Sequence, residues 1–290
     1  MILFRMIQGI LFLLPRPVCL ALGKGLGSLF YLIDRRRRHI ALANLQRAFG
    51  NDLSGKEKRA IAKNSFRHFG RTMVDILKLS LGRPERAARL ITLEGKKNLV
   101  NALKQKKGIL MFSAHYGNWE VAPLLISKFT RLNVIARPLD SPRLERELLK
   151  IRSFFRAHVI YKQQASREIL RALGKNEMVA ILIDQNVLRR EAVFIDFFGT
   201  AAATTPGLAT FHLRTHSPLV PVFCYPQGRG YSLHIGAALN IPLTGDLKEN
   251  IGTVTQRCTG VIEGLIRQKP EYWLWFHDRF RSRPEPPEES

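Results

Sequence analysis

The sequence contains few cysteines. Its three cysteines, Cys19, Cys224 and Cys258, are odd in number and form no Cys-x-x-Cys pair. A disulfide framework or a zinc ribbon therefore does not fit this chain, whereas a reducing compartment does. We treat all three side chains as ordinary apolar residues.

Acidic residues are also scarce: 23 aspartates and glutamates stand against 46 lysines and arginines, which gives a formal net charge of +23. Such an excess favours anionic partners. Nucleic acid, an anionic membrane surface and an acidic protein all meet this description. Because no nucleic-acid-binding motif accompanies the charge, we predict no nucleic acid partner.

The apolar N-terminal region, residues 1–33, lacks a run of 18 uncharged residues. Arg5, the Pro15–Pro17 break and Lys24 interrupt it. A helix that spans a bilayer needs about 20 apolar residues. A secretory signal does not fit either, because the break divides the apolar stretch and no small-residue cleavage site follows.

Two shorter apolar segments, residues 2–14 and 18–33, instead predict helices that dip into a membrane or lie on it. The second contains Gly23 and Gly27, a spacing that permits a close helix contact. The four arginines Arg35–Arg38 follow directly and suit an anionic, cytoplasmic headgroup region. A solvated charge run is the alternative interpretation of these arginines.

From about residue 88, short apolar strands alternate with helices, whereas the preceding region is helical. Ser54 and Glu57 form a capping-box pattern at the start of a helix expected over residues 54–80. The alternation predicts an α/β fold with a central, mainly parallel sheet flanked by helices, preceded by an N-terminal apolar membrane-associating helical segment. We expect strands over 108–113, 133–137, 159–161, 178–184, 192–198, 219–225 and 231–239, and helices over 117–130, 141–155, 164–174, 205–215 and 246–268.

The chain divides into three parts on this interpretation. Residues 1–33 form the membrane-associating segment, and residues 34–284 form one α/β domain. Residues 285–290, which are polar and rich in proline, are predicted to be a disordered tail.

The segment that carries the clearest chemistry is Ala114–Glu120, with the sequence Ala-His-Tyr-Gly-Asn-Trp-Glu. His115 follows an apolar strand, and the carboxyl end of a strand in an α/β sheet is where ligands usually bind. A histidine there is well placed to act as a general base. Glu120 can reach back to its ring if His115 lies on a turn that Gly117 makes sharp. A lone histidine, in contrast, is more often structural.

Other catalytic signatures are missing. The chain has no Gly-x-Ser-x-Gly elbow, so a covalent acyl-enzyme is not expected. His212 and His216 are four residues apart, but position 213 is Leu rather than the Glu of a zinc protease motif. We therefore predict neither a metal nor a cofactor.

The Ala114–Glu120 segment resembles the H-x4-D/E motif of the glycerolipid acyltransferase superfamily. Its Gly-Asn-Trp-Glu ending resembles the lipid A late acyltransferases, the lauroyl/myristoyl family. Five further segments match that family in order, so the resemblance covers about residues 1–284: Arg35–Phe49, Arg137-Pro138 with the helix carrying Arg152, Asp184-Gln185, Phe197–Gly199 with Thr205 and Gly207, and Glu271–Pro284. One departure is Asp278, at a position where the family leads us to expect a basic residue.

The resemblance implies transfer of a fatty acyl group from acyl carrier protein to a hydroxyl of a lipid A precursor, at the cytoplasmic face of the inner membrane. His115 would take the hydroxyl proton, and Glu120 would orient His115 and stabilise its cationic form. Arg152 would stabilise the developing oxyanion or bind a substrate phosphate. A surface ion pair is the alternative role for Arg152.

Three further residues at expected strand ends, Arg137, Asp184 and Gln185, are candidates for binding the acceptor. Strand-end capping is an equally open reading of Asp184. We expect His277 and its aromatic neighbours to serve in packing.

Other functions also remain open from the sequence. The acceptor could be another lysophospholipid or a glycolipid, and the donor could be a coenzyme A thioester. A non-catalytic basic protein that binds membranes or nucleic acid would explain the charge but not the ordered motifs.

Overall fold

Seven strands form the central sheet of the computed structural model, which describes residues 2–161 and 165–284. Their order across the sheet is β1-β9-β8-β2-β5-β3-β4. Every neighbouring pair is parallel except β8 and β9, which confirms the mainly parallel sheet. The strands are β1 (Ile91–Glu94), β2 (Ile109–Ser113), β3 (Leu132–Ala136), β4 (His158–Tyr161), β5 (Met178–Leu182), β8 (Leu219–Gln227) and β9 (Gly230–Ile235).

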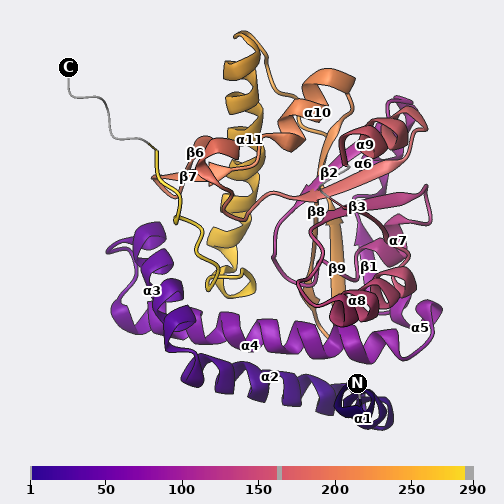
Figure 1. Cartoon of the computed structure of the whole chain (residues 1–290), viewed down its shortest axis with the longest axis vertical. Coiled ribbons are helices and arrows are strands. Elements are labelled where there is room, and N and C mark those ends of the chain that lie inside the picture. The colour runs from indigo at the N-terminus through magenta and orange to yellow at the C-terminus, as the bar shows by residue number, and fades with distance from the viewer. Residues whose placement is uncertain (1, 162–164, 285–290) are drawn as a thin grey trace.

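Helices cover both faces of this sheet, and the two long helices α2 (Arg16–Ile33) and α4 (Gly55–Ser80) run across its lower end in Figure 1. The other helices are α1 (Ile2–Leu13), α3 (Arg35–Phe49), α5 (Pro84–Ala88), α6 (Lys96–Lys104), α7 (Pro123–Ile126), α8 (Pro142–Phe154), α9 (Ala165–Gly174), α10 (Gly207–Thr215) and α11 (Leu247–Gln268). The predicted capping box of Ser54 and Glu57 begins α4. The predicted alternation of strands and helices is therefore present.

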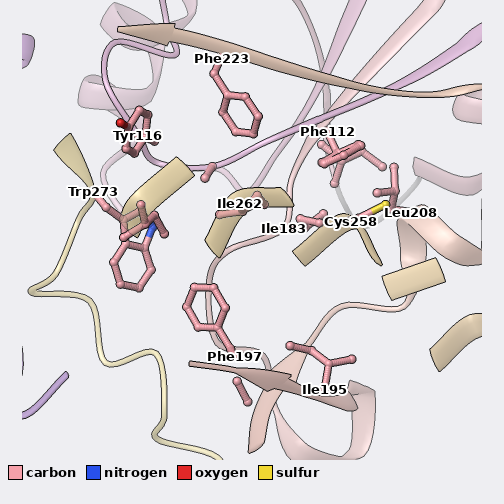
Figure 2. Packing of buried hydrophobic residues seen from close by; sticks show 14 of the residues in the cluster. Phe112, Tyr116, Ile183, Ile195, Phe197, Leu208, Phe223, Cys258, Ile262 and Trp273 are labelled. Carbon is pink, nitrogen blue, oxygen red and sulfur yellow. The ribbon is translucent and has the colours of Figure 1, made fainter. Parts of the chain in front are cut away.

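The core lies in two layers, one on each face of the sheet. Strand β2 contributes to both, because successive side chains of a strand point to opposite faces. Leu110 and Phe112 join the cluster with α9, α10 and α11, whereas Ile109 and Met111 join the cluster with α6 and α7. Figure 2 shows Phe112 in the first cluster. A strand that is buried on both faces explains the continuous apolar run that precedes His115.

Helix α2 lies along α4 in a close contact made by glycines (Figure 1). A Cβ added at Gly23 would lie 2.6 Å from the backbone oxygen of Gly70, and one at Gly27 would lie 2.2 Å from that of Phe66. The close helix contact that the spacing of Gly23 and Gly27 permits is therefore present.

No single helix in the described part of the chain is long and apolar enough to cross a membrane. Helices α2 and α3 meet the length and composition test only as a pair, and they meet at a 91° bend.

Two sequence expectations differ from the structure, and one lies beyond it. The helix expected over 117–130 is reduced to α7, because Gly117 turns the chain and Trp119 and Glu120 lie in turns before Pro123. The strand expected over 192–198 is β6 (Val193–Phe197), which pairs with β7 (Thr200–Thr204) in a separate hairpin. The predicted tail, residues 285–290, lies outside the described residues.

Candidate active site

The candidate site lies where β2 and β5 end. These strands are parallel neighbours, and their last paired residues are Ser113 and Leu182. His115 and Asp184 each lie two residues beyond that pair, so the register brings them to the same place at the sheet edge. The carboxyl edge of a parallel sheet collects polar side chains in this way.

Asp184 holds His115 at two points. Its Oδ1 is 2.9 Å from His115 Nδ1, and its Oδ2 accepts the backbone N–H of His115 at 2.9 Å. The indole Nε1 of Trp273 donates to the same Oδ2 at 2.8 Å. Burial alone would raise the pKa of Asp184, which is only 2% exposed, but the interaction with His115 and these hydrogen bonds lower it to about 2. Asp184 is therefore an ionised acceptor at neutral pH.

An ionised Asp184 fixes the tautomer of His115. A carboxylate can only accept hydrogen bonds, so Nδ1 carries the proton and Nε2 of the neutral ring is left as the basic nitrogen. The side-chain nitrogen of Gln185 lies 3.3 Å from this Nε2. The ring of Trp119 lies edge-on to the imidazole, with 4.9 Å between centroids. The site thus presents one basic nitrogen beside an amide and an indole.

Glu120 does not occupy the role that the sequence predicted for it. The carboxylate that holds the His115 ring is that of Asp184, and Glu120 instead pairs with Arg152 from α8. Arg152 Nη2 lies 2.9 Å from Glu120 Oε1, and Nε lies 3.3 Å from Oε2. The reason is geometric: Glu120 lies beyond the Gly117 turn, whereas Asp184 is in register with His115.

The ion pair of Glu120 and Arg152 lies at an apolar cavity. Most of the lining comes from β2, β3, β5 and β8, and includes Met111, Ile126, Val134, Ala180, Leu182 and Val222. Burial alone would lower the pKa of Arg152, but neighbouring charges, Glu120 first, raise it. Nη1 of Arg152 is buried and has no hydrogen-bond partner among the described residues. A fixed cation with a spare donor therefore stands at the wall of a hydrophobic cavity.

The remaining predicted site residues lie at different distances from this centre. Gln185 is brought to His115, as described above. Arg137 follows β3, its side chain is 84% exposed, and its ion-pair partner is Asp140 at 3.7 Å. No contact of the described residues joins Arg137 to His115.

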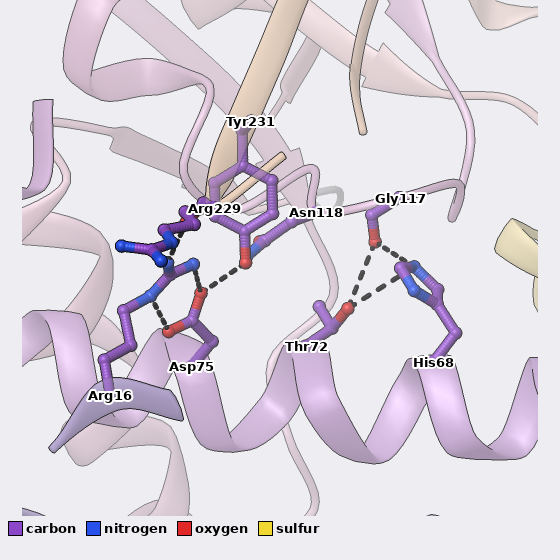
Figure 3. A network of polar contacts seen from close by, with 8 residues as sticks. All are labelled: Arg16, His68, Thr72, Asp75, Gly117, Asn118, Arg229 and Tyr231. Carbon is purple, nitrogen blue, oxygen red and sulfur yellow. Dashed lines mark hydrogen bonds and ion pairs between the residues drawn. The ribbon is translucent and has the colours of Figure 1, made fainter. Parts of the chain in front are cut away.

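The turn after His115 is held from three sides. Gly117 has φ +66°, and a Cβ there would lie 2.1 Å from the backbone oxygen of Cys224. His68 and Thr72 of α4 contact the Gly117 carbonyl at 3.0 and 3.4 Å (Figure 3).

Asn118 is fully buried, and its amide donates to the hydroxyl of Tyr231 at 2.9 Å. The backbone that carries His115 is thus anchored to α4 and to β9.

Sequence reasoning missed the part played by the C-terminal segment. Trp273 and His277 were expected only to pack, yet Trp273 donates to Asp184, and His277 Nε2 accepts the backbone N–H of Asn186 at 3.0 Å. Burial lowers the pKa of His277 to about 4, so its ring is a neutral acceptor at neutral pH. The clustering of polar and aromatic residues after residue 270 was the available signal.

Arg279 joins the C-terminal segment to the hairpin that contains the Phe197–Gly199 motif. It is fully buried and donates to the Ala203 carbonyl and the Thr204 hydroxyl of β7, each at 2.5 Å. Its guanidinium lies 5.2 Å from the centre of the Phe197 ring. The two motifs therefore form one structural unit behind the site.

A family model for the bacterial lipid A biosynthesis acyltransferases matches residues 2–282. The chain belongs to this family. The matched residues include His115, Asp184 and the C-terminal segment up to Ser282.

Curated relatives agree with this membership. The chain is 28% identical to a lipid A biosynthesis lauroyltransferase of Escherichia coli, over 94% of this chain and 88% of that protein. It is 26% identical to a lipid A biosynthesis palmitoleoyltransferase of the same organism, over 93% and 87%. It is also 25% identical to a phosphatidylinositol mannoside acyltransferase of Mycobacterium tuberculosis, over 76% and 71%.

Proposed function

We propose that the protein transfers a fatty acyl group from an acyl carrier protein thioester to a hydroxyl of a lipid A precursor. The observation that carries this proposal is the His115–Asp184 pair at the sheet edge, in a chain of this family. His115 Nε2 takes the hydroxyl proton as the oxygen attacks the thioester carbon. The carrier thiolate then leaves and takes up the proton from His115, so no acyl-enzyme forms.

Arg152 is the group that we assign to the thioester carbonyl. Its buried Nη1 has no partner among the described residues, and Arg152 is one of the residues that line the cavity. A donor of this kind stabilises the negative charge that develops on the carbonyl oxygen. Glu120 keeps the guanidinium in place through their ion pair. It therefore positions Arg152 and does not act on His115.

The apolar cavity is the natural place for the acyl chain. It is lined by aliphatic side chains of four strands, and its wall includes Trp119, whose ring contacts that of His115. Burying a methylene group contributes about 0.8 kcal/mol, so a long chain is held by such a cavity without polar contacts. Gln185, which neighbours the basic nitrogen, and Arg137 are candidates for contact with the acceptor.

A membrane supplies the lipid acceptor in this proposal, at the cytoplasmic face of the inner membrane. Exposed large apolar side chains are concentrated in α1 and α2, where Leu13 is 82% exposed and Ile33 is 70% exposed. Arg35–Arg37, directly after α2, are exposed as well. An apolar face beside a cationic one suits an anionic membrane surface. The net charge of +23 also favours the acidic acyl carrier protein.

The test is transfer by the purified protein and its H115A variant, with an acyl carrier protein thioester and a lipid A precursor. We expect H115A to fold and to lose about 10³-fold in kcat, within the range of general-base catalysis. Circular dichroism checks the fold. Full activity in folded H115A would reject the mechanism.

A second acceptor class has support of its own, because some relatives are phosphatidylinositol mannoside acyltransferases. Mass spectrometry of lipids from cells lacking the protein separates the two. Loss of one ester-linked chain from lipid A supports our proposal. An unchanged lipid A together with an altered glycolipid supports the alternative.

A further inference from the structure

A small pocket lies behind the His115 turn, between α2, α4 and the loop that joins β8 to β9. Its volume is about 50 Å³, several times the 10–15 Å³ that one water molecule needs. Three arginines, Arg16, Arg71 and Arg229, line it together with His68 and Tyr231. Arginines from three separate elements thus line one hollow, and two of them, Arg71 and Arg229, are exposed to solvent.

Buried partners hold one of these arginines in place. Asp75, which is fully buried, accepts from Arg16 Nε at 2.7 Å and from Nη2 at 2.6 Å (Figure 3). The Tyr231 hydroxyl donates to the same carboxylate, and Arg16 Nη1 donates to the backbone carbonyl of Arg229. Arg16 is therefore fixed, and it in turn fixes the loop that carries Arg229.

The charges around the pocket do not balance. Asp75 neutralises one guanidinium, while the side chains of Arg71 and Arg229 have no hydrogen bond or ion pair within residues 2–161 and 165–284. Burial, with a smaller contribution from Arg71, lowers the pKa of His68 to about 4, so His68 adds no charge at neutral pH. Two uncompensated guanidiniums remain, and this group matches the oxygens of a phosphate with paired donors.

The place of the pocket relates it to both the membrane helices and the site. Arg16 begins α2, and exposed apolar residues such as Val18 and Leu22 follow on that helix. On the inner side, His68 and Thr72 contact the carbonyl of Gly117, two residues after His115. An anion in the pocket would lie between the apolar surface and the catalytic turn.

We propose that Arg71, Arg229 and Arg16 bind the phosphate group of a lipid. The identification of that lipid with the acceptor rests on the proposed function. A phosphorylated glycolipid acceptor and an anionic phospholipid of the bilayer offer the same chemistry, and the test separates them.

The first arm compares R71Q, R229Q and R257Q in transfer assays in neutral detergent. R257Q is the matched control, because Arg257 is exposed on α11 and has no ion pair among the described residues. We expect the KM for a phosphorylated acceptor to rise about tenfold in R71Q and R229Q, the loss of one charge-assisted hydrogen bond. The KM for the dephosphorylated acceptor should be the same in all three variants and in the wild type.

The second arm measures flotation of the same proteins with phosphatidylcholine vesicles, with and without phosphatidylglycerol. If R71Q and R229Q lose phosphatidylglycerol-dependent binding but keep the acceptor KM, the phosphate belongs to a bilayer lipid. If both variants match R257Q in both arms, the proposal is wrong. The flotation measurement does not depend on acyl transfer. If the wild type is inactive on lipid A precursors, the proposed function is rejected, and flotation still tests whether the pocket binds a lipid phosphate.

Discussion

Two carboxylates lie close to the segment that carries His115, and they serve different partners. Asp184 is 2% exposed, accepts three hydrogen bonds and holds the His115 ring. Glu120 belongs to the histidine motif itself, yet it pairs with Arg152 at the cavity. The difference teaches that strand register, rather than distance along the chain, decides which carboxylate holds the His115 ring.

The largest effect is expected when Asp184 becomes Asn. The amide can donate to Nδ1, which would place the proton on Nε2 and leave no basic nitrogen toward the acceptor. We expect D184N to lose about 10³-fold in kcat with little change in KM. Steady-state kinetics with both substrates varied is the measurement. A loss below about threefold would remove Asp184 from the mechanism.

A smaller effect is expected at the other carboxylate. E120Q leaves Arg152 without its countercharge, so the guanidinium is less well fixed at the cavity. We expect kcat to fall about 30-fold, below the loss of a complete oxyanion donor. The pH dependence of kcat should be the same as in the wild type, because the His115–Asp184 pair is intact. A displaced profile would show that Glu120 acts on His115 after all.

A still smaller effect should come from the hydrogen-bond chain behind the turn. Y231F removes the hydroxyl that joins Asn118 to Asp75. S232A, on the same strand, removes the hydrogen bond from the buried Ser232 to Glu94, which does not touch the turn, and is the matched control. We expect about a fivefold loss of kcat in Y231F and none in S232A, at a similar loss of stability of about 1 kcal/mol. Equal kinetics in the two variants would leave Tyr231 a purely structural role.

An effect of a different kind is expected on stability, which should depend on pH. His68 and His277 each have a pKa of about 4 because of burial, below the ordinary value near 6.5. Between these values the unfolded chain binds more protons, so stability rises with pH by up to about 1.4 kcal/mol per unit for each histidine. H277Q keeps an acceptor for Asn186 but does not titrate. Urea unfolding from pH 4 to 7 should give a shallower pH dependence for H277Q, and parallel curves would exclude His277 as a source.

Much of the fold could be predicted because the pattern of apolar residues reports burial directly. The run before His115 predicts a strand that is covered on both faces, and β2 has both core clusters against it. The capping box at Ser54 and the glycine contact of α2 rest on local chemistry, and both are present. The prediction of a helix over 117–130 was wrong, because Pro123 and the packing of the turn against β8 override the helical spacing.

The site was predictable in its members but not in its pairings. His115, Asp184 and Gln185 were named from strand ends, and the structure brings them together. The order of the strands in the sheet decides that β5 lies beside β2. Asp184, which follows β5, is 69 positions after His115 in the sequence. Nothing in the local sequence reports that neighbour, so Glu120 was given the role of Asp184. Trp273, from the C-terminal segment, was missed for the same reason.

The most direct measurement is the transfer rate of the double variant H115A/D184N beside that of H115A alone. If Asp184 acts only by holding His115, removing it after the histidine is gone changes nothing further. We therefore predict that the two rates agree within about twofold. A double variant that is about tenfold slower than H115A would contradict the account, because Asp184 would then act on the substrates independently of His115.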